Sequence, residues 1–124
     1  MIQSHKDLIV WQKGVDLVLS IYKLTKDFPK EEIYGITSQI RRAAISIPSN
    51  IAEGRSRGTR KDFAQFLRIA FGSGAELETQ LLIAKKLSFG QEIGYNKVAD
   101  QLDEVMRMLN AMIHKLTQPL TAKS

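Results

Sequence analysis

The sequence predicts an all-α protein, a single up-down antiparallel four-helix bundle. Apolar residues recur three and four positions apart in four long segments, which is the spacing of one helix face. No segment shows sustained alternation of apolar and polar residues, and the connections between the four segments are short. The length of 124 residues suits one domain, so we expect a single bundle over residues 1–124 with flexible ends at 1–5 and 118–124.

The first helix is expected over residues 7–27. An apolar stripe runs from Leu8 to Tyr22 with spacings of three and four, and the Phe28-Pro29 pair marks the end of the helix. Further apolar side chains widen the apolar arc to roughly 220°, more than one face of a bundle needs. This surplus predicts a second buried surface and hence self-association, although a broad contact within one chain is the alternative. The residues expected at the oligomer interface are Leu17, Ile21 and Leu24.

A second helix is expected over residues 33–54, kinked at Pro48. Proline lacks the N–H group that would bond to the Ala44 carbonyl, and its ring crowds the preceding turn. Ser46 and Ser49 are placed to form local hydrogen bonds beside this break. The glycine-rich segment 54–58 then predicts the clearest loop of the chain.

The third and fourth helices are expected over residues 59–87 and 95–116. Thr59 followed by Asp62 resembles a capping box with Asp in place of Glu, which places the start of the third helix. A turn with two glycines separates the two helices. The four segments are therefore joined in the order that an antiparallel bundle requires.

Polar residues beside the apolar arcs form a candidate structural cluster. Glu78 is expected to project within the apolar arc of the third helix, and a carboxylate that faces a core must be paired or protonated. Arg42 and Asn50, on one flank of the second helix, are its candidate partners. An acid/base pair in a cleft is the alternative, but no nucleophile accompanies it. The predicted cluster comprises Arg42, Asn50, Glu53, Glu76 and Glu78.

The net charge of the chain is concentrated in one segment. Residues 41–68 contain seven Lys and Arg residues against two acids, a surplus of +5 that equals the formal net charge of the whole chain. Six of the seven arginines lie there, and the planar guanidinium suits phosphate better than the lysine ammonium does. This pattern predicts a face that binds a polyanion, with a merely solvated surface as the alternative. The predicted nucleic-acid contacts are Arg41, Arg55, Arg57, Arg60, Lys61 and Arg68.

The chain lacks the residues that several kinds of catalytic or metal-binding site need. The absence of cysteine excludes disulfides, thiolate metal sites and cysteine nucleophiles. The two histidines, His5 and His114, show no Glu-x-x-His spacing, and the loop at 54–58 lacks the Gly-Lys-Ser/Thr ending of a phosphate loop. The chain begins with residues too polar for a signal peptide and has no apolar run that could cross a bilayer. We therefore expect a cytoplasmic protein without membrane contact, catalytic residues, metal or cofactor.

Four stretches of the chain resemble one known family. The run from Gln39 to Gly54, QIRRAAISIPSNIAEG, is the most distinctive of them. Leu8–Lys13, Phe63–Ala70 and Gly74–Gln80 extend the likeness to roughly residues 5–116. The chain resembles the bacterial four-helix bundle family named for proteins encoded in intervening sequences of 23S rRNA genes.

The resemblance implies properties that the composition does not. It implies a bundle that assembles as a ring, typically a homopentamer, with no established enzymatic activity. It also implies similarity to the accessory variability determinant of diversity-generating retroelements, a basic pentamer that binds nucleic acid and a reverse transcriptase. Five copies would raise the net charge of +5 to about +25, enough for salt-sensitive binding to RNA or DNA.

The sequence is compatible with two functions of different classes. The first is a non-enzymatic oligomeric protein that binds RNA or DNA through backbone phosphates. Since few aromatic side chains are expected to be free for base stacking, little sequence specificity is expected. The second is a protein–protein adaptor or accessory subunit whose arginines meet an acidic partner, with nucleic-acid binding incidental.

Overall fold

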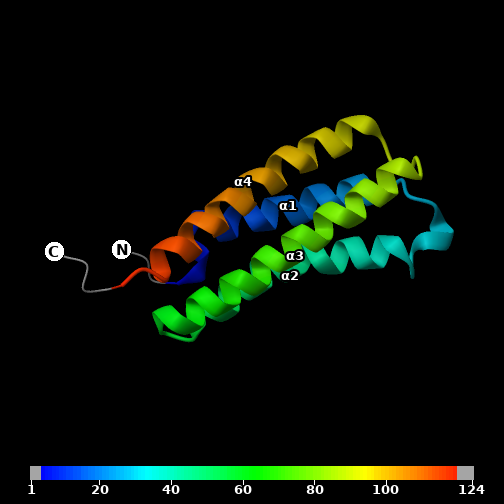
Figure 1. The fold of residues 1–124 in the computed structure, drawn as a ribbon. Coiled ribbons are helices and arrows are strands. Elements are labelled where there is room, and N and C mark those ends of the chain that lie inside the picture. Colours follow the sequence, from blue (N-terminus) through cyan, green and yellow to red (C-terminus); the bar gives the residue numbers. More distant parts are fainter. Residues whose placement is uncertain (1–3, 120–124) are drawn as a thin grey trace.

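The computed structural model describes residues 4–119 and confirms the predicted all-α fold (Figure 1). Four long helices follow one another, with a 3-10 turn before the first and another between the first two. No strand occurs within the described range. The elements are a 3-10 turn His5–Asp7, α1 Ile9–Thr25, a 3-10 turn Lys30–Glu32, α2 Ile36–Ser56, α3 Arg60–Lys86 and α4 Glu92–Leu116.

The helices form a square in which each contacts two neighbours. α1 packs on α2 and α4, α3 packs on the same two helices, and no Cα atoms of a diagonal pair lie within 8 Å of each other among the described residues. Figure 1 shows that successive helices run in opposite directions, as an up-down bundle requires. The α2–α3 turn lies at the end where α1 begins and α4 finishes, and the α1–α2 connection lies at the opposite end.

The core is centred on a stripe of α1 beside the one that the first apolar pattern suggests, and Trp11 and Val18 of that pattern pack against it. Leu17 and Ile21 have no exposed surface and Leu24 is 5% exposed within a single chain. The prediction that these three residues form an oligomer interface is therefore wrong. The stripe spaced 10, 14, 17, 21 and 24 faces the core, while Leu19 and Tyr22 are 64% and 40% exposed. Both stripes have helical spacing, and only packing decides which one faces inward.

The boundary between α2 and α3 differs from the prediction. α2 continues to Ser56, so Gly54 is helical and the predicted loop at 54–58 shrinks to the residues around Gly58, whose φ is +87°. Gly54 is buried against α3, and a Cβ atom there would lie 2.6 Å from Cβ of Phe66. Glycine at this position therefore permits close packing of two helices and does not mark a loop.

Two other helix starts also differ from the predicted ones. α2 begins at residue 36 and not at 33, because a turn at residues 33–35 follows the 3-10 turn at 30–32. α4 begins at residue 92 and not at 95, directly after Gln91 in an extended conformation. The second helix is thus shorter at its start than predicted, and the fourth helix is longer at its start.

α2 passes through Pro48 without a break in its helical assignment. The proline is buried, and its ring lies opposite Gly14 of α1, where an added Cβ would be 3.5 Å from Cβ of Pro48. Ser46 forms the expected local hydrogen bonds: Asn50 Nδ2 donates to its carbonyl oxygen over 2.8 Å and to its Oγ over 2.9 Å. The kink itself stays a prediction.

The expected flexible ends fall mostly outside the described residues, which exclude 1–3 and 120–124. Ser4 and His5, expected in the flexible N-terminal segment, belong to a capped 3-10 turn. The Ser4 hydroxyl accepts from Lys6 N over 3.2 Å, and Ser4 N donates to Asp7 Oδ2 over 3.3 Å. At the other end, Gln118 Nε2 lies 2.8 Å from His114 Nε2.

Candidate functional site

The α2–α3 turn presents the start of a long helix beside several basic residues. Gly58 has a positive φ of +87°, which glycine adopts readily and which reverses the chain within a few residues. Thr59 then caps α3, and its hydroxyl accepts from Asp62 N over 3.1 Å. Of the two hydrogen bonds of the predicted capping box, the structure contains this one, accepted by the Thr59 side chain. The first N–H groups of α3 are available at this turn, next to the C-terminal ends of α2 and α4.

A cavity of about 260 Å³ lies at this turn and is bordered by Arg55 and Arg60. Gly58, Thr59 and Phe63 supply the α2–α3 side of the cavity, and Leu116 of α4 closes it. Arg60 Nη2 donates to the Lys115 carbonyl over 3.1 Å and to the Leu116 carbonyl over 3.4 Å. The guanidinium is therefore held at the C-terminal end of α4 and is positioned before any ligand arrives.

Arg57 and Glu53 form a surface pair one turn apart on α2. Arg57 Nη2 lies 3.0 Å from Glu53 Oε2, and the guanidinium carbon lies 4.9 Å from the centre of the Phe66 ring. Both side chains are about half exposed, so the pair adds little stability. Glu53 is thus paired with Arg57, at the turn, and does not join the predicted polar cluster around Glu78.

Lys61 and Arg68 lie further along α3 and are exposed. They are seven residues apart, close to two helical turns, so they lie on one side of the helix about 10 Å apart. Within residues 4–119, neither side chain has a hydrogen-bond or ion-pair partner. They extend the basic surface of the turn along α3.

Arg41 does not belong to this surface, contrary to the prediction. It precedes Arg55 by fourteen residues, which is about 21 Å along α2. Its Nε donates to Thr25 Oγ1 over 2.9 Å, and its guanidinium carbon lies 4.4 Å from the centre of the Tyr22 ring. The structure therefore places five of the six predicted phosphate contacts at the α2–α3 turn and along α3, and the sixth near the other end of α2.

The predicted polar cluster is only partly assembled. Arg42 and Glu76 border an open groove of about 500 Å³ between α2 and α3, with Ser46 and Ser73 between them. The two serine Oγ atoms are 2.8 Å apart. Glu76 Oε2 accepts from Gln80 Nε2 over 3.4 Å. This groove carries both signs of charge, so it lacks the surplus of cations found at the turn.

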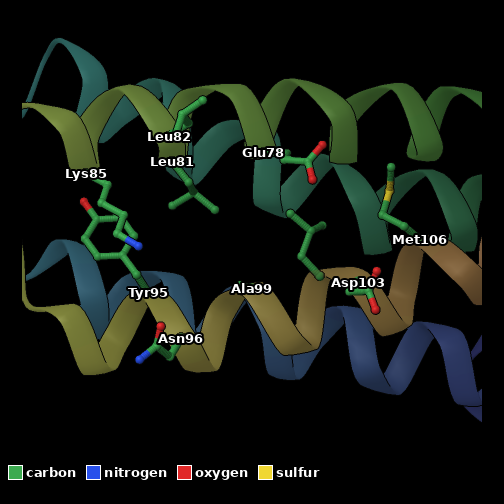
Figure 2. A pocket seen from close by; sticks show the side chains of 10 residues that line it. Glu78, Leu81, Leu82, Lys85, Tyr95, Asn96, Ala99, Asp103 and Met106 are labelled. Carbon is green, nitrogen blue, oxygen red and sulfur yellow. The ribbon is translucent and has the colours of Figure 1, made fainter.

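Glu78 is exposed and faces a different groove, between α3 and α4, so the prediction that it faces the core is wrong (Figure 2). Its position is one residue beyond the buried Leu77, which rotates the side chain out of the core arc. This groove, of about 270 Å³, has Glu78 from α3 and Asp103 from α4 on its two sides. Asp103 Oδ2 lies 3.2 Å from Arg107 Nε. Carboxylates on both sides make the groove unsuited to a polyanion.

Tyr95 lies at one end of the same groove (Figure 2). Its hydroxyl donates to the Phe89 carbonyl over 2.6 Å and is only slightly exposed. Burial, with a smaller contribution from the Glu92 carboxylate, raises the pKa of Tyr95 to about 12. The phenol is therefore a neutral structural donor that fastens the α3–α4 turn.

Sequence reasoning missed two features beside the predicted site residues. Tyr34 is 95% exposed on the rim of the α2–α3 groove, so an aromatic ring is free after all. Thr37 is 2% exposed, and its Oγ1 has no partner in the part of the chain that the structure describes. The position of Tyr34 between two helices was a possible signal for its exposure. Nothing in the local pattern reveals that Thr37 is unpaired.

No group of three or more His, Cys, Asp or Glu side chains could hold a metal ion in the range 4–119. The helices within it also lack an apolar stretch long enough to cross a bilayer.

The fold and the basic turn define a small four-helix bundle protein with one arginine-rich end. The model of the 23S rRNA-intervening sequence protein family matches residues 6–111, so the chain belongs to that family. Among solved structures it is similar to a protein of unknown function from the S23 ribosomal protein family of Bacteroides thetaiotaomicron. That match has 25% sequence identity and a TM-score of 0.78, and covers 86% of this chain and 96% of the other. No curated protein matches the chain.

Proposed function

We propose that this protein is a non-enzymatic, oligomeric binder of RNA or DNA that holds backbone phosphates at the α2–α3 turn. The observation that carries the proposal is the cavity at the start of α3, bordered by Arg55 and Arg60. Guanidinium groups beside the N-terminus of a helix are a favourable setting for a phosphate, because the dipole and the free N–H groups add to their charge. Membership in a family named for an rRNA insertion agrees with this choice.

The charges around the turn support a polyanion over a neutral ligand. Asp62 and Glu53 are the acids of this surface, and Glu53 is engaged by Arg57. Residues 53–68 carry five Lys and Arg side chains against these two acids, a surplus of +3. Since phosphate contacts carry no sequence information, we expect affinity to depend strongly on salt and weakly on base sequence.

The oligomer is the second part of the proposal, and a homopentameric ring is the form that we favour from the family resemblance. Its support is an exposed apolar surface on α1 and α2. Leu19 is 64% exposed, and Tyr22 and Ile45 are each 40% exposed. Ile45 follows Arg41 by one turn on α2, and Arg41 covers Tyr22, so the three apolar residues lie along the α1–α2 seam. This surface replaces Leu17, Ile21 and Leu24 as the candidate interface.

Charge reversal at the turn tests the binding site. We expect Arg55→Glu, Arg57→Glu and Arg60→Glu together to lower the affinity for a structured RNA or a DNA duplex by at least about tenfold at 0.15 M salt. The slope of log affinity against log salt should also become shallower. Fluorescence anisotropy with labelled RNA and duplex DNA over a salt series measures both quantities.

A matched control changes the same amount of charge elsewhere. Lys23→Glu, Lys86→Glu and Lys97→Glu together alter three exposed lysines away from the turn. Equal loss of affinity in both triple variants would contradict a specific site at the turn. If the wild-type protein binds neither nucleic acid near physiological salt, the arginines serve an acidic protein partner, of which a reverse transcriptase is the candidate suggested by the family resemblance.

A further inference from the structure

A second basic pocket lies at the α1–α2 end of the bundle, away from the α2–α3 turn. Its volume is about 270 Å³, and the end of α1, the following connection and the start of α2 enclose it. Three cationic side chains border it, Lys26, Lys30 and Arg41, together with the hydroxyl-bearing Thr25 and Thr37. We propose that this pocket binds a phosphate group.

Two contacts fix the position of the Arg41 side chain beside the pocket. Its Nε donates to Thr25 Oγ1 over 2.9 Å, and its guanidinium plane lies against Tyr22, with 4.4 Å between the guanidinium carbon and the ring centre. Thr25 is itself fixed, because its hydroxyl donates to the Ile21 carbonyl over 2.8 Å. The two terminal nitrogens of Arg41 have no partner in the described residues. A positioned guanidinium loses little conformational freedom when it binds an anion.

Thr37 supplies an independent observation that points to a ligand. Its side chain is 2% exposed and borders the pocket, and its Oγ1 has no hydrogen-bond partner within residues 4–119. A buried hydroxyl without a partner is unfavourable, so such groups are rare in folded proteins. Thr37 borders the pocket, so a phosphate that enters it and shifts this side chain would accept a hydrogen bond from the hydroxyl.

The acids of the same connection lie outside the pocket. Asp27 borders a separate groove between α1 and α4. Glu32 Oε1 accepts from Ile36 N over 3.4 Å and so caps α2, and Glu31 does not border the pocket. The side chains that face the pocket therefore carry three positive charges and no negative one. This imbalance favours phosphate over a neutral or cationic ligand.

The pocket is distinct from the proposed site at the α2–α3 turn. The two lie at opposite ends of α2, with Arg41 and Arg55 about 21 Å apart along the helix (Figure 1). The phosphate could be a monoester, free or at the end of a ligand, or a diester in a nucleic-acid strand. Each site can therefore bind or fail to bind without the other.

Amide chemical shifts of the full chain, recorded by ¹H–¹⁵N NMR during titration with inorganic phosphate, test the proposal. The ionic strength is held constant with chloride. We expect saturable shifts at Thr37 and Ser38, at the start of α2. Shifts at Thr59 to Lys61 report separately on the α2–α3 turn, so failure of one site is distinguishable from failure of the other. No response at Thr37 and Ser38 beyond that of chloride would overturn the proposal.

Two variants of the pocket sharpen the test. Thr37→Val keeps the shape of the side chain and removes the unpaired hydroxyl, so we expect phosphate affinity to fall about tenfold while the melting temperature does not decrease. Lys30→Gln changes an exposed charge and should also weaken phosphate binding. Lys86→Gln, an exposed lysine on α3, is the matched control and should leave the titration unchanged. Wild-type affinity in both pocket variants would refute the assignment.

The source of the phosphate is resolved by two further titrations. Methyl phosphate is a monoester and dimethyl phosphate is a diester. Shifts at Thr37 with methyl phosphate alone assign the pocket to a terminal or free phosphate. Shifts with both compounds assign it to the backbone of a nucleic-acid strand.

Discussion

At the scale of single residues, one position along a helix decides whether a polar group is structural or exposed. Glu78 lies next to the buried Leu77 yet is exposed. Thr37 follows the partly buried Ile36 and is itself 2% exposed, with an unpaired hydroxyl. Successive side chains on a helix differ by about 100° in direction, so a small error in the assumed core direction exchanges a core residue for a surface one.

Tyr95 gives a pH-dependent prediction at this scale. Its pKa is raised to about 12 in the folded chain, above the ordinary value of 10.0. The protonated phenol therefore stabilises the folded state fully below pH 10, and this contribution is lost as the pH rises through 12. We expect Tyr95→Phe to lower the free energy of unfolding by about 1 kcal/mol at pH 7, through loss of the hydrogen bond to Phe89.

Urea denaturation between pH 7 and pH 12 measures this difference. The gap between wild type and Tyr95→Phe should shrink above pH 10, because the phenol ionises in the unfolded chain from pH 10 while the folded phenol stays protonated up to about pH 12. Tyr34→Phe, at a tyrosine that is 95% exposed, is the control and should follow the wild type throughout. A gap that stays constant to pH 12 would contradict the assigned role of Tyr95.

At the scale of elements, α1 illustrates how two apolar stripes compete for one core. The inward stripe includes Gly14, which lies against the Pro48 ring of α2, and Leu17. The other stripe includes Leu19 and Tyr22, which remain exposed in the single chain. Contacts between α1 and its neighbours, among them that of Gly14 with Pro48, bury the inward stripe and leave Leu19 and Tyr22 outside.

Two leucines on α1 test this rotation directly. We expect Leu17→Ala to lower the free energy of unfolding by about 2–5 kcal/mol, because it leaves a cavity in the core. Leu19→Ala, two residues away on the same helix, should change it by less than about 0.5 kcal/mol in the dissociated chain. Chemical denaturation at low protein concentration compares the two. A larger effect at Leu19 than at Leu17 would reverse the assigned faces.

At the scale of the whole molecule, the basic turn and the exposed apolar seam of α1 and α2 lie on different parts of the bundle. The basic turn lies at one end of the bundle, while the exposed apolar residues Leu19, Tyr22 and Ile45 lie along the α1–α2 seam. A ring formed through that seam would leave the turns of all subunits free. Five basic turns on one assembly would bind a polyanion more tightly than one turn alone, because each contact raises the effective concentration of the next.

The assembled mass tests this arrangement. For a pentamer of 14.0 kDa chains we expect about 70 kDa by light scattering coupled to size-exclusion chromatography. Leu19→Lys should shift the mass toward that of the single chain, because it places a charge on the apolar seam. Lys97→Gln should not. A mass of one chain at all protein concentrations would remove the oligomer from the proposal.

The sequence by itself determined the four helices, the family and the concentration of positive charge. Helical spacing, short connections and the run from Gln39 to Gly54 are local properties of the chain. The charge of each segment can be counted without knowing the fold. Tertiary structure decided which stripe of α1 is buried, and it separated Arg41 from Arg55 by the length of α2. It also gathered Lys26, Lys30 and Arg41 around Thr37. The physical reason is that spacing fixes the period of a helix, whereas its rotation and its neighbours depend on contacts between residues far apart in the chain.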